Sequence, residues 1–134
     1  MEYGDKGMIS DIDAFRGHLQ TMVTLLENMI AEGDKILPPP ESIGFCEQAR
    51  RILFRNLKEL DSGLSLKDPD SIVHSILLTN SDLGHFTEYD LSWSRLWRTS
   101  DVRERVYAAA QRLIHIDDII ANKSTILAGL RAGE

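Results

Sequence analysis

Acidic and histidine side chains recur at one-turn spacing in the second half of the chain, a pattern typical of metal sites in helical bundles. Asp82, His85 and Glu88 follow one another at intervals of three residues, which places them on one face of a helix. His115 and Asp118 repeat this spacing further along the chain. Metal-binding bundles take such pairs from neighbouring helices, together with carboxylates from the other two. These residues are the candidate ligands, and the chemistry would be metal-assisted hydrolysis.

Three features of the sequence argue against this metal site. Most acids of the set are aspartates, and the pair of Asp82 and His85 straddles Gly84, a residue that weakens helices. The N-terminal half offers no well-placed inward glutamate, and its only helical histidine, His18, lies off the apolar face of its helix. We therefore expect no metal ion or other cofactor, and we interpret the set as polar positions at the edge of a core.

The only cysteine, Cys46, lies on the apolar face of a predicted helix. A thiol in such a place is usually buried and inert, and a single cysteine cannot form a disulfide within the chain. The sequence contains no phosphate-binding loop, no zinc-type set of cysteines and histidines, and neither a GxSxG nor an HExxH motif. These observations favour a reducing compartment and a function without catalysis.

The most unusual local composition combines both tryptophans with four arginines within residues 93–105. Trp and Arg dominate the binding energy of protein interfaces, so this stretch is the predicted partner-binding site. Two alternatives remain open: the tryptophans fill one end of a bundle while the arginines pair with nearby acids, or they wall a pocket for a small ligand. The predicted partner-binding residues are Trp93, Trp97, Arg95, Arg98, Arg103 and Arg105.

Helices must position these residues, and the clearest predicted helix covers residues 101–130. Its apolar residues alternate at steps of three and four, the repeat of helices that pack side by side, and no proline interrupts them. Thr99, Ser100 and Asp101 can cap its first turn. The apolar face consists of Val102, Val106, Ala109, Leu113, Ile116, Ile120, Leu127 and Leu130.

Two further helices are predicted in the first half of the chain. The first begins at Ser10, whose hydroxyl forms a capping box with Asp13, and ends at Gly33. The second begins at Pro40 or Ser42 and ends at Gly63. Their apolar residues, all at helical spacing, are Ile12, Phe15, Leu19, Met22, Val23, Leu26, Met29 and Ile30 in the first and Ile43, Cys46, Ala49, Leu53, Leu57 and Leu60 in the second.

A third helix begins at Asp68, an N-cap followed by Pro69 at the first helical position. We predict that it continues over about residues 69–97, with a break near Gly84 as the alternative. The sum is an all-α fold, an antiparallel four-helix bundle in one domain of residues 1–134. Residues 1–9 form a loose N-terminus and residues 34–41 a proline-rich linker. The last two helices are expected to be the longer ones, which leaves an apolar face for a second copy or a partner.

The charge of the chain limits its partners. The formal net charge is −6, so nucleic acid is an unlikely partner, because each phosphate contact needs a nearby cation. Only residues 94–134 reverse the balance, with seven basic and five acidic residues. No stretch approaches the length of an apolar membrane span, and the acidic start lacks a secretory signal, so we expect a cytoplasmic protein without a membrane segment.

The residues together predict a non-enzymatic bundle that acts through protein–protein interaction, as an adaptor, a regulator or a self-assembling protein. It would bind another protein or itself, as a homodimer for example, through its long C-terminal helices and the Trp/Arg stretch. The alternative is a metal- or small-ligand-binding bundle, with a site between the third and fourth helices and with catalysis as an open option.

Overall fold

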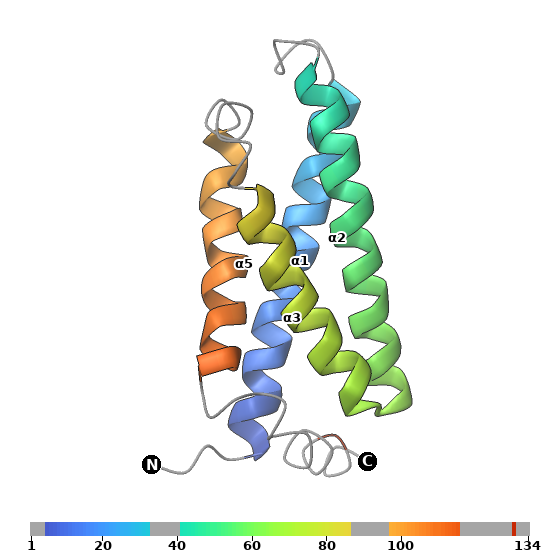
Figure 1. Cartoon of the computed structure of the whole chain (residues 1–134), viewed down its shortest axis with the longest axis vertical. Coiled ribbons are helices and arrows are strands. Elements are labelled where there is room, and N and C mark those ends of the chain that lie inside the picture. Colours follow the sequence, from blue (N-terminus) through green and yellow to red (C-terminus); the bar gives the residue numbers. More distant parts are fainter. Residues whose placement is uncertain (1–4, 33–40, 87–96, 116–129, 131–134) are drawn as a thin grey trace.

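The computed structural model describes residues 5–32, 41–86 and 97–115 together with Leu130, and the surroundings of side chains for residues 9–32, 44, 46–84, 102–114 and 130. The described residues form four helices, which run alternately up and down (Figure 1). The predicted all-α antiparallel bundle is therefore confirmed. The helices are α1 (Asp5–Glu32), α2 (Glu41–Leu66), α3 (Pro69–Phe86) and α5 (Trp97–His115).

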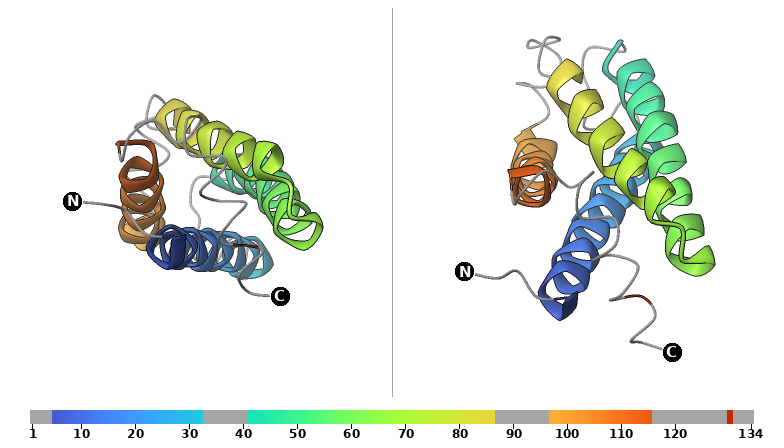
Figure 2. Two further views of the ribbon diagram at one scale, coloured as in Figure 1. Left: turned by 90° about the horizontal axis from the view of Figure 1, so that it is seen from below. Right: turned by 60° about the horizontal axis from the view of Figure 1, so that its bottom comes forward.

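Each helix packs along two neighbours, which gives the bundle a ring of contacts (Figure 2). Helix α1 lies between α2 and α5, and α3 closes the ring on the opposite side, also between α2 and α5. In the part of the chain that the structure describes, α1 and α2 are longer, at 28 and 26 residues, than α3 and α5, at 18 and 19. The stretches predicted to lengthen the last two helices lie mainly in residues 87–96 and 116–129, outside that part.

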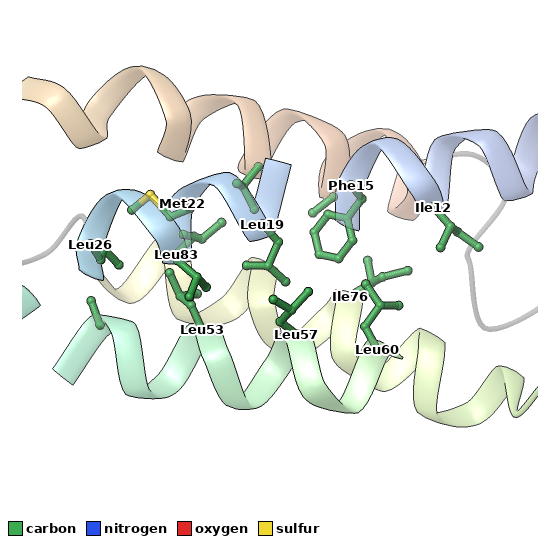
Figure 3. Close-up of a cluster of buried hydrophobic side chains, with 14 of the residues drawn as sticks. Ile12, Phe15, Leu19, Met22, Leu26, Leu53, Leu57, Leu60, Ile76 and Leu83 are labelled. Atoms are coloured by element: carbon green, nitrogen blue, oxygen red, sulfur yellow. The ribbon is translucent and has the colours of Figure 1, made fainter. Parts of the chain in front are cut away.

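The core lies where the apolar faces of the helices meet (Figure 3). Phe15 and Leu19 of α1 are fully buried, and they face the side chains of Leu53, Leu57 and Leu60 of α2 and of Ile76 of α3. The predicted apolar spacing of the first two helices is confirmed at these positions. The buried apolar residues are Ile12, Phe15, Leu19, Met22, Val23, Leu26, Met29, Cys46, Ala49, Leu53, Leu57, Leu60, Ile72, Val73, Ile76, Leu83, Val106, Ala110 and Leu113.

Helix α1 begins earlier than its capping box predicts. The helix starts at Asp5, so Ser10 is an exposed residue within it and the predicted N-cap is wrong. The added turn carries Ile9, which lies one turn before Ile12 and packs partly buried against the core. Because this contact favours helix formation while an exposed serine in a helix costs little, the helix extends through the predicted start.

Helix α2 ends three residues later than predicted, because a Schellman motif rather than Gly63 terminates it. The amide of Asp68 donates to the carbonyl of Gly63 at 2.9 Å, and Lys67 between them adopts the left-handed conformation with φ 54°. Gly63 stays inside the helix, where a Cβ atom would lie 3.0 Å from Cγ1 of Ile72. The glycine therefore permits a close approach of α2 and α3, and the predicted helix end at this residue is wrong.

Asp68 also caps the helix that follows, as predicted. Its carboxylate accepts from the backbone amide of Asp70 at 3.1 Å and from the hydroxyl of Ser71 at 2.9 Å. Pro69 occupies the first helical position, where its missing amide hydrogen costs no hydrogen bond. The two helices are thus joined by a turn of two residues, and they form an α2–α3 hairpin.

Two further predictions concerned the continuation of α3 beyond Gly84 and the residues that cap the start of α5. Helix α3 runs through Gly84 to Phe86 without a break at the glycine, and its predicted continuation over residues 87–96 lies outside the described residues. Helix α5 begins at Trp97, so the cap predicted over residues 99–101 is wrong, since these residues are already helical. Val106 and Leu113 are buried as predicted, and Leu130 packs partly buried against the core.

Candidate functional site

The candidate metal ligand Asp82 on α3 interacts with two side chains of helix α2. Its Oδ2 atom accepts a hydrogen bond of 2.8 Å from the side-chain amide of Asn56, and it lies 4.0 Å from a guanidinium nitrogen of Arg55. The Asn56 side chain is almost completely buried between the helices. Asp82 therefore has a structural task in this fold: it satisfies a buried amide donor at the α2–α3 interface.

The backbone register separates the other metal candidates. The side chain of Gln111 on α5 donates to that of Asn80 on α3 at 2.6 Å, which fixes the level of the two antiparallel helices. His85 lies five residues after Asn80, and His115 lies four residues after Gln111 on a helix that runs the opposite way. The backbones of the two histidines are therefore separated along the bundle axis by roughly nine residues, or ~13 Å. Glu88 and Asp118 lie outside the described residues. Within the part described, no three side chains of His, Cys, Asp or Glu converge in a geometry that could hold a metal ion.

The predicted partner-binding residues distribute unevenly over the structure. Trp93 and Arg95 lie outside the described residues, and Trp97 and Arg98 are the first two residues of α5. Arg103 and Arg105 line two different cavities, one on each edge of α5. Two residues advance a helix by about 200°, so one arginine faces α3 and the other faces α1. The structure thus divides Arg103 and Arg105 between two surfaces.

The first surface is a groove between α3 and α5, with a cavity volume of about 320 Å³, which we call the α3–α5 groove. Tyr107 is 43% exposed and is one of two large hydrophobic residues in the described structure that remain exposed. Gly84 keeps the groove open, because no described atom lies within 4 Å of the Cβ position that it lacks. The lining residues are Leu83, Gly84, Arg103, Glu104 and Tyr107.

The second surface is a trough between α1 and α5, also of about 320 Å³, which we call the α1–α5 trough. An ion pair of 3.0 Å between Arg112 and Asp11 connects its two walls. The described residues that line it combine charged side chains with alanines: Asp11, Ala14, His18, Arg105, Ala108, Ala109 and Arg112.

A third cavity, of about 370 Å³, lies between α1 and α2, and we call it the α1–α2 cleft. Arg50 lies 3.6 Å from Glu27 across the cleft, and its guanidinium stacks over the ring of Phe54 at 4.4 Å. Glu47 and Arg51 also line the cleft, so its described charged residues balance to zero.

The thiol of Cys46 is buried, as predicted. Burial among apolar side chains, with a smaller contribution from the charge of Glu47, raises the pKa of this thiol to about 11. The group is therefore protonated at neutral pH, and a protonated thiol is a poor nucleophile.

Sequence reasoning missed two of the residues that these surfaces use. Tyr107 escaped notice because it lies off the apolar face of its helix, and only the packing of α3 reveals that it borders a groove. His18 was noted only as lying off the apolar face, whereas the structure places it in the α1–α5 trough. A usable signal was present in the spacing of Arg105, Ala108 and Arg112, which lie on one face of a helix.

Comparison of the chain with family models finds no match, and searches of curated proteins and of solved structures find no significant similarity. Within the described residues, no helix combines the length and the apolar character that crossing a membrane requires.

Proposed function

We propose that this protein is a helical-bundle interaction module that acts without catalysis and binds a protein partner through the α3–α5 groove. The observation that carries the proposal is the exposed ring of Tyr107 at the edge of a cavity that Arg103 also lines. Tyrosine and arginine are, with tryptophan, the residue types most enriched among the residues that dominate interface energy, particularly in well-packed pockets.

The composition of the groove supports a protein partner. Leu83 gives it an apolar base and Gly84 leaves room above the helix backbone, while Arg103 and Glu104 add charges of opposite sign. A partner helix could insert one apolar side chain beside Tyr107 and pair with the charges at the rim. The partner is a second protein or a second copy of this chain, in an adaptor or regulatory role.

The position of Tyr107 differs from that of the other exposed apolar residue. Leu66 is 74% exposed, but it lies at the tip of the α2–α3 hairpin and does not line the groove, the trough or the cleft described above. Leu66 is therefore a matched control for exposure without a groove. We further propose that the module works in the cytoplasm, where the buried thiol of Cys46 stays reduced.

Site-specific photocrosslinking tests the proposal. The photoreactive residue p-benzoylphenylalanine replaces Tyr107 in one variant and Leu66 in the other, and both are irradiated in cells and as purified protein. We expect protein adducts from position 107 that exceed those from position 66, and we expect Arg103→Glu to reduce them. Adducts in the purified sample would identify a second copy as the partner, and sedimentation equilibrium would measure that dimer.

Equal or absent adducts at the two positions, in cells and in the purified protein, would overturn the proposal. The same conclusion would follow if adducts from position 107 were insensitive to Arg103→Glu, because the groove would then play no part in the contact.

A further inference from the structure

Helix α5 presents a polar face to solvent, opposite the face that it buries. Val106 and Ala110 lie in the core, and because successive residues of a helix are about 100° apart, Ala108 between them points away from the core. Ala108 is exposed, and so are Glu104 and Arg112, one turn before and one turn after it. Glu104, Ala108 and Arg112 form a row at four-residue spacing, which we call the α5 row.

The charges of the α5 row are complementary to those of a second copy. Glu104 is acidic, Arg112 is basic, and Ala108 lies midway between them. When a second copy packs antiparallel on the first, a twofold axis beside Ala108 brings Glu104 of each copy opposite Arg112 of the other. One row therefore supplies both partners of two identical ion pairs, as an isologous contact requires.

Both charged side chains can take part in such pairs. Glu104 has no ion-pair partner among the described residues. Arg112 donates from its Nε atom to Asp11 at 3.0 Å, but its side chain is 65% exposed and a guanidinium has five N–H donors. Arg112 can therefore bind a carboxylate of a second copy while it keeps its pair with Asp11.

The middle of the row permits a close approach of two helices. Ala108 has no side chain beyond Cβ, and rows at four-residue spacing are the ridges along which helices most often pack, with axes crossing at about −50°. Tyr107 is 43% exposed and lies next to the twofold axis. The two copies of its ring therefore come to the same edge of the contact, where aromatic rings can pack against each other.

We propose that this chain forms a twofold-symmetric homodimer through the outer face of α5, with the contact centred on Ala108. Two ion pairs between Glu104 and Arg112 of opposite copies flank the centre, and Tyr107 closes one edge. This inference rests on the proposed function, because Glu104 and Tyr107 also line the α3–α5 groove, and it identifies the partner as a second copy. One helix per copy buries less than the roughly 1,200–2,000 Å² of stable interfaces, so we expect a weak dimer whose population depends on concentration.

Disulfide trapping in the full chain tests the position of the axis. Ala108→Cys places two thiols next to the axis, at a separation that a disulfide can span. The natural thiol of Cys46 is buried and protonated, so it does not compete. Gln48→Cys, at an exposed position of α2, is the matched control. Under mild oxidation, covalent dimer should form about tenfold faster from position 108 than from position 48, because the dimer raises the local concentration of the second thiol. Equal rates would overturn the inference.

Charge reversal tests the two ion pairs. Glu104→Arg and Arg112→Glu each replace two attractive pairs by two repulsive ones, so each should weaken the dimer by about tenfold in sedimentation equilibrium. A mixture of the two variants should restore association, because each charge then meets an opposite charge across the contact. Arg51→Glu changes the net charge as Arg112→Glu does, but at an exposed position of α2, and it should leave the dimer unchanged.

A second pair of variants keeps the test independent of the pair with Asp11, which Arg112→Glu removes. Ala108→Glu and Ala108→Lys each place like charges at the axis, so each should dimerise weakly alone and associate when the two are mixed. Circular dichroism checks that every variant keeps its helices.

The inference is overturned if the natural chain stays monomeric at about 1 mM, or if neither mixture associates better than its separate variants. A monomer whose position 107 still gives Arg103-dependent adducts in cells would overturn this inference and leave the proposed function standing.

Discussion

The α2–α3 hairpin and helix α5 hold their places in the bundle by different means. The hairpin joins two helices through a turn of two residues, a close approach at Gly63 and a part-buried hydrogen bond between Asn56 and Asp82. Helix α5 contributes smaller side chains to the core, among them Ala110, and a cavity lies along each of its edges. The hairpin is built for a defined register, whereas α5 leaves space that a ligand or a partner can occupy.

This difference separates stability from binding within one small fold. Substitutions in the hairpin should change the free energy of unfolding, because its contacts are close and buried. Substitutions on the edges of α5 should change binding with little effect on that free energy, because exposed residues contribute little to it.

The largest expected effect concerns the hydrogen bond between buried Asn56 and partly exposed Asp82 in the hairpin. Asp82→Ala removes the acceptor of the Asn56 amide, and a buried donor without a partner costs roughly 1–3 kcal/mol. We expect a loss of about 2 kcal/mol in the free energy of unfolding, measured by urea denaturation. The pair with Arg55 adds little to this value, because that arginine is mostly exposed.

Asn56→Leu supplies the control for this prediction. The Oδ1 atom of Asn56 is buried and accepts no hydrogen bond within the described structure. Leucine at this position removes that unsatisfied oxygen, and it also removes the amide donor that Asp82 would otherwise have to accept from. In the Asn56→Leu background, Asp82→Ala should cost less than about 0.5 kcal/mol. An equal cost in both backgrounds would show that Asp82 stabilises the fold by some other contact.

Gly63 of α2 and Gly84 of α3 should respond with opposite changes in the free energy of unfolding when each is replaced by alanine. Gly63→Ala places a methyl group 3.0 Å from Cγ1 of Ile72 and 3.1 Å from its backbone nitrogen, so we expect a loss of about 1 kcal/mol after the gain in helix propensity. Gly84→Ala meets no described atom within 4 Å and should gain about 1 kcal/mol. Thermal unfolding of both variants measures the contrast, and equal signs would contradict it.

A smaller gain is expected at the turn of the hairpin. Lys67 adopts φ 54°, a conformation that costs an L-residue roughly 1–2 kcal/mol and a glycine almost nothing. Lys67→Gly should therefore stabilise the protein by about 0.5–1 kcal/mol, part of the gain being lost to the greater freedom of glycine in the unfolded chain. Lys67→Ala keeps the conformational cost and should give no gain, so a gain from alanine would refute this account.

The smallest effect on stability is expected on α5. Tyr107→Ala removes an exposed side chain and should change the free energy of unfolding by less than about 0.5 kcal/mol. A loss greater than 1 kcal/mol, the range of buried residues, would show that Tyr107 stabilises the bundle and would weaken its assignment to an interface.

The sequence predicted the fold well, because apolar spacing reports directly which side of a helix is buried. It also predicted the cap at Asp68, a local contact between residues close in the chain. The end of α2 was predicted wrongly, since a glycine that terminates a helix and one that admits a neighbouring helix have the same local sequence signature. Only the position of Ile72 in space distinguishes the two roles of Gly63.

The candidate surfaces were less predictable, for a related reason. Arg103 and Arg105 belong to one basic stretch of the sequence, but the choice of neighbouring helices divides them between the groove and the trough. The trough itself depends on the level at which α1 meets α5. That level follows from tertiary packing and a long-range ion pair between Asp11 and Arg112, which no local spacing encodes.

The two-residue turn of the hairpin has a consequence for the order of folding. Closing so short a loop costs little chain entropy, whereas α1 and α5 must find each other across most of the sequence. We therefore expect α2 and α3 to pair early, in the transition state, and α5 to dock late. In stopped-flow experiments, Asp82→Ala should then mainly slow refolding, and Val106→Ala should mainly accelerate unfolding. The reverse pattern would mean that α5 takes part in the folding nucleus.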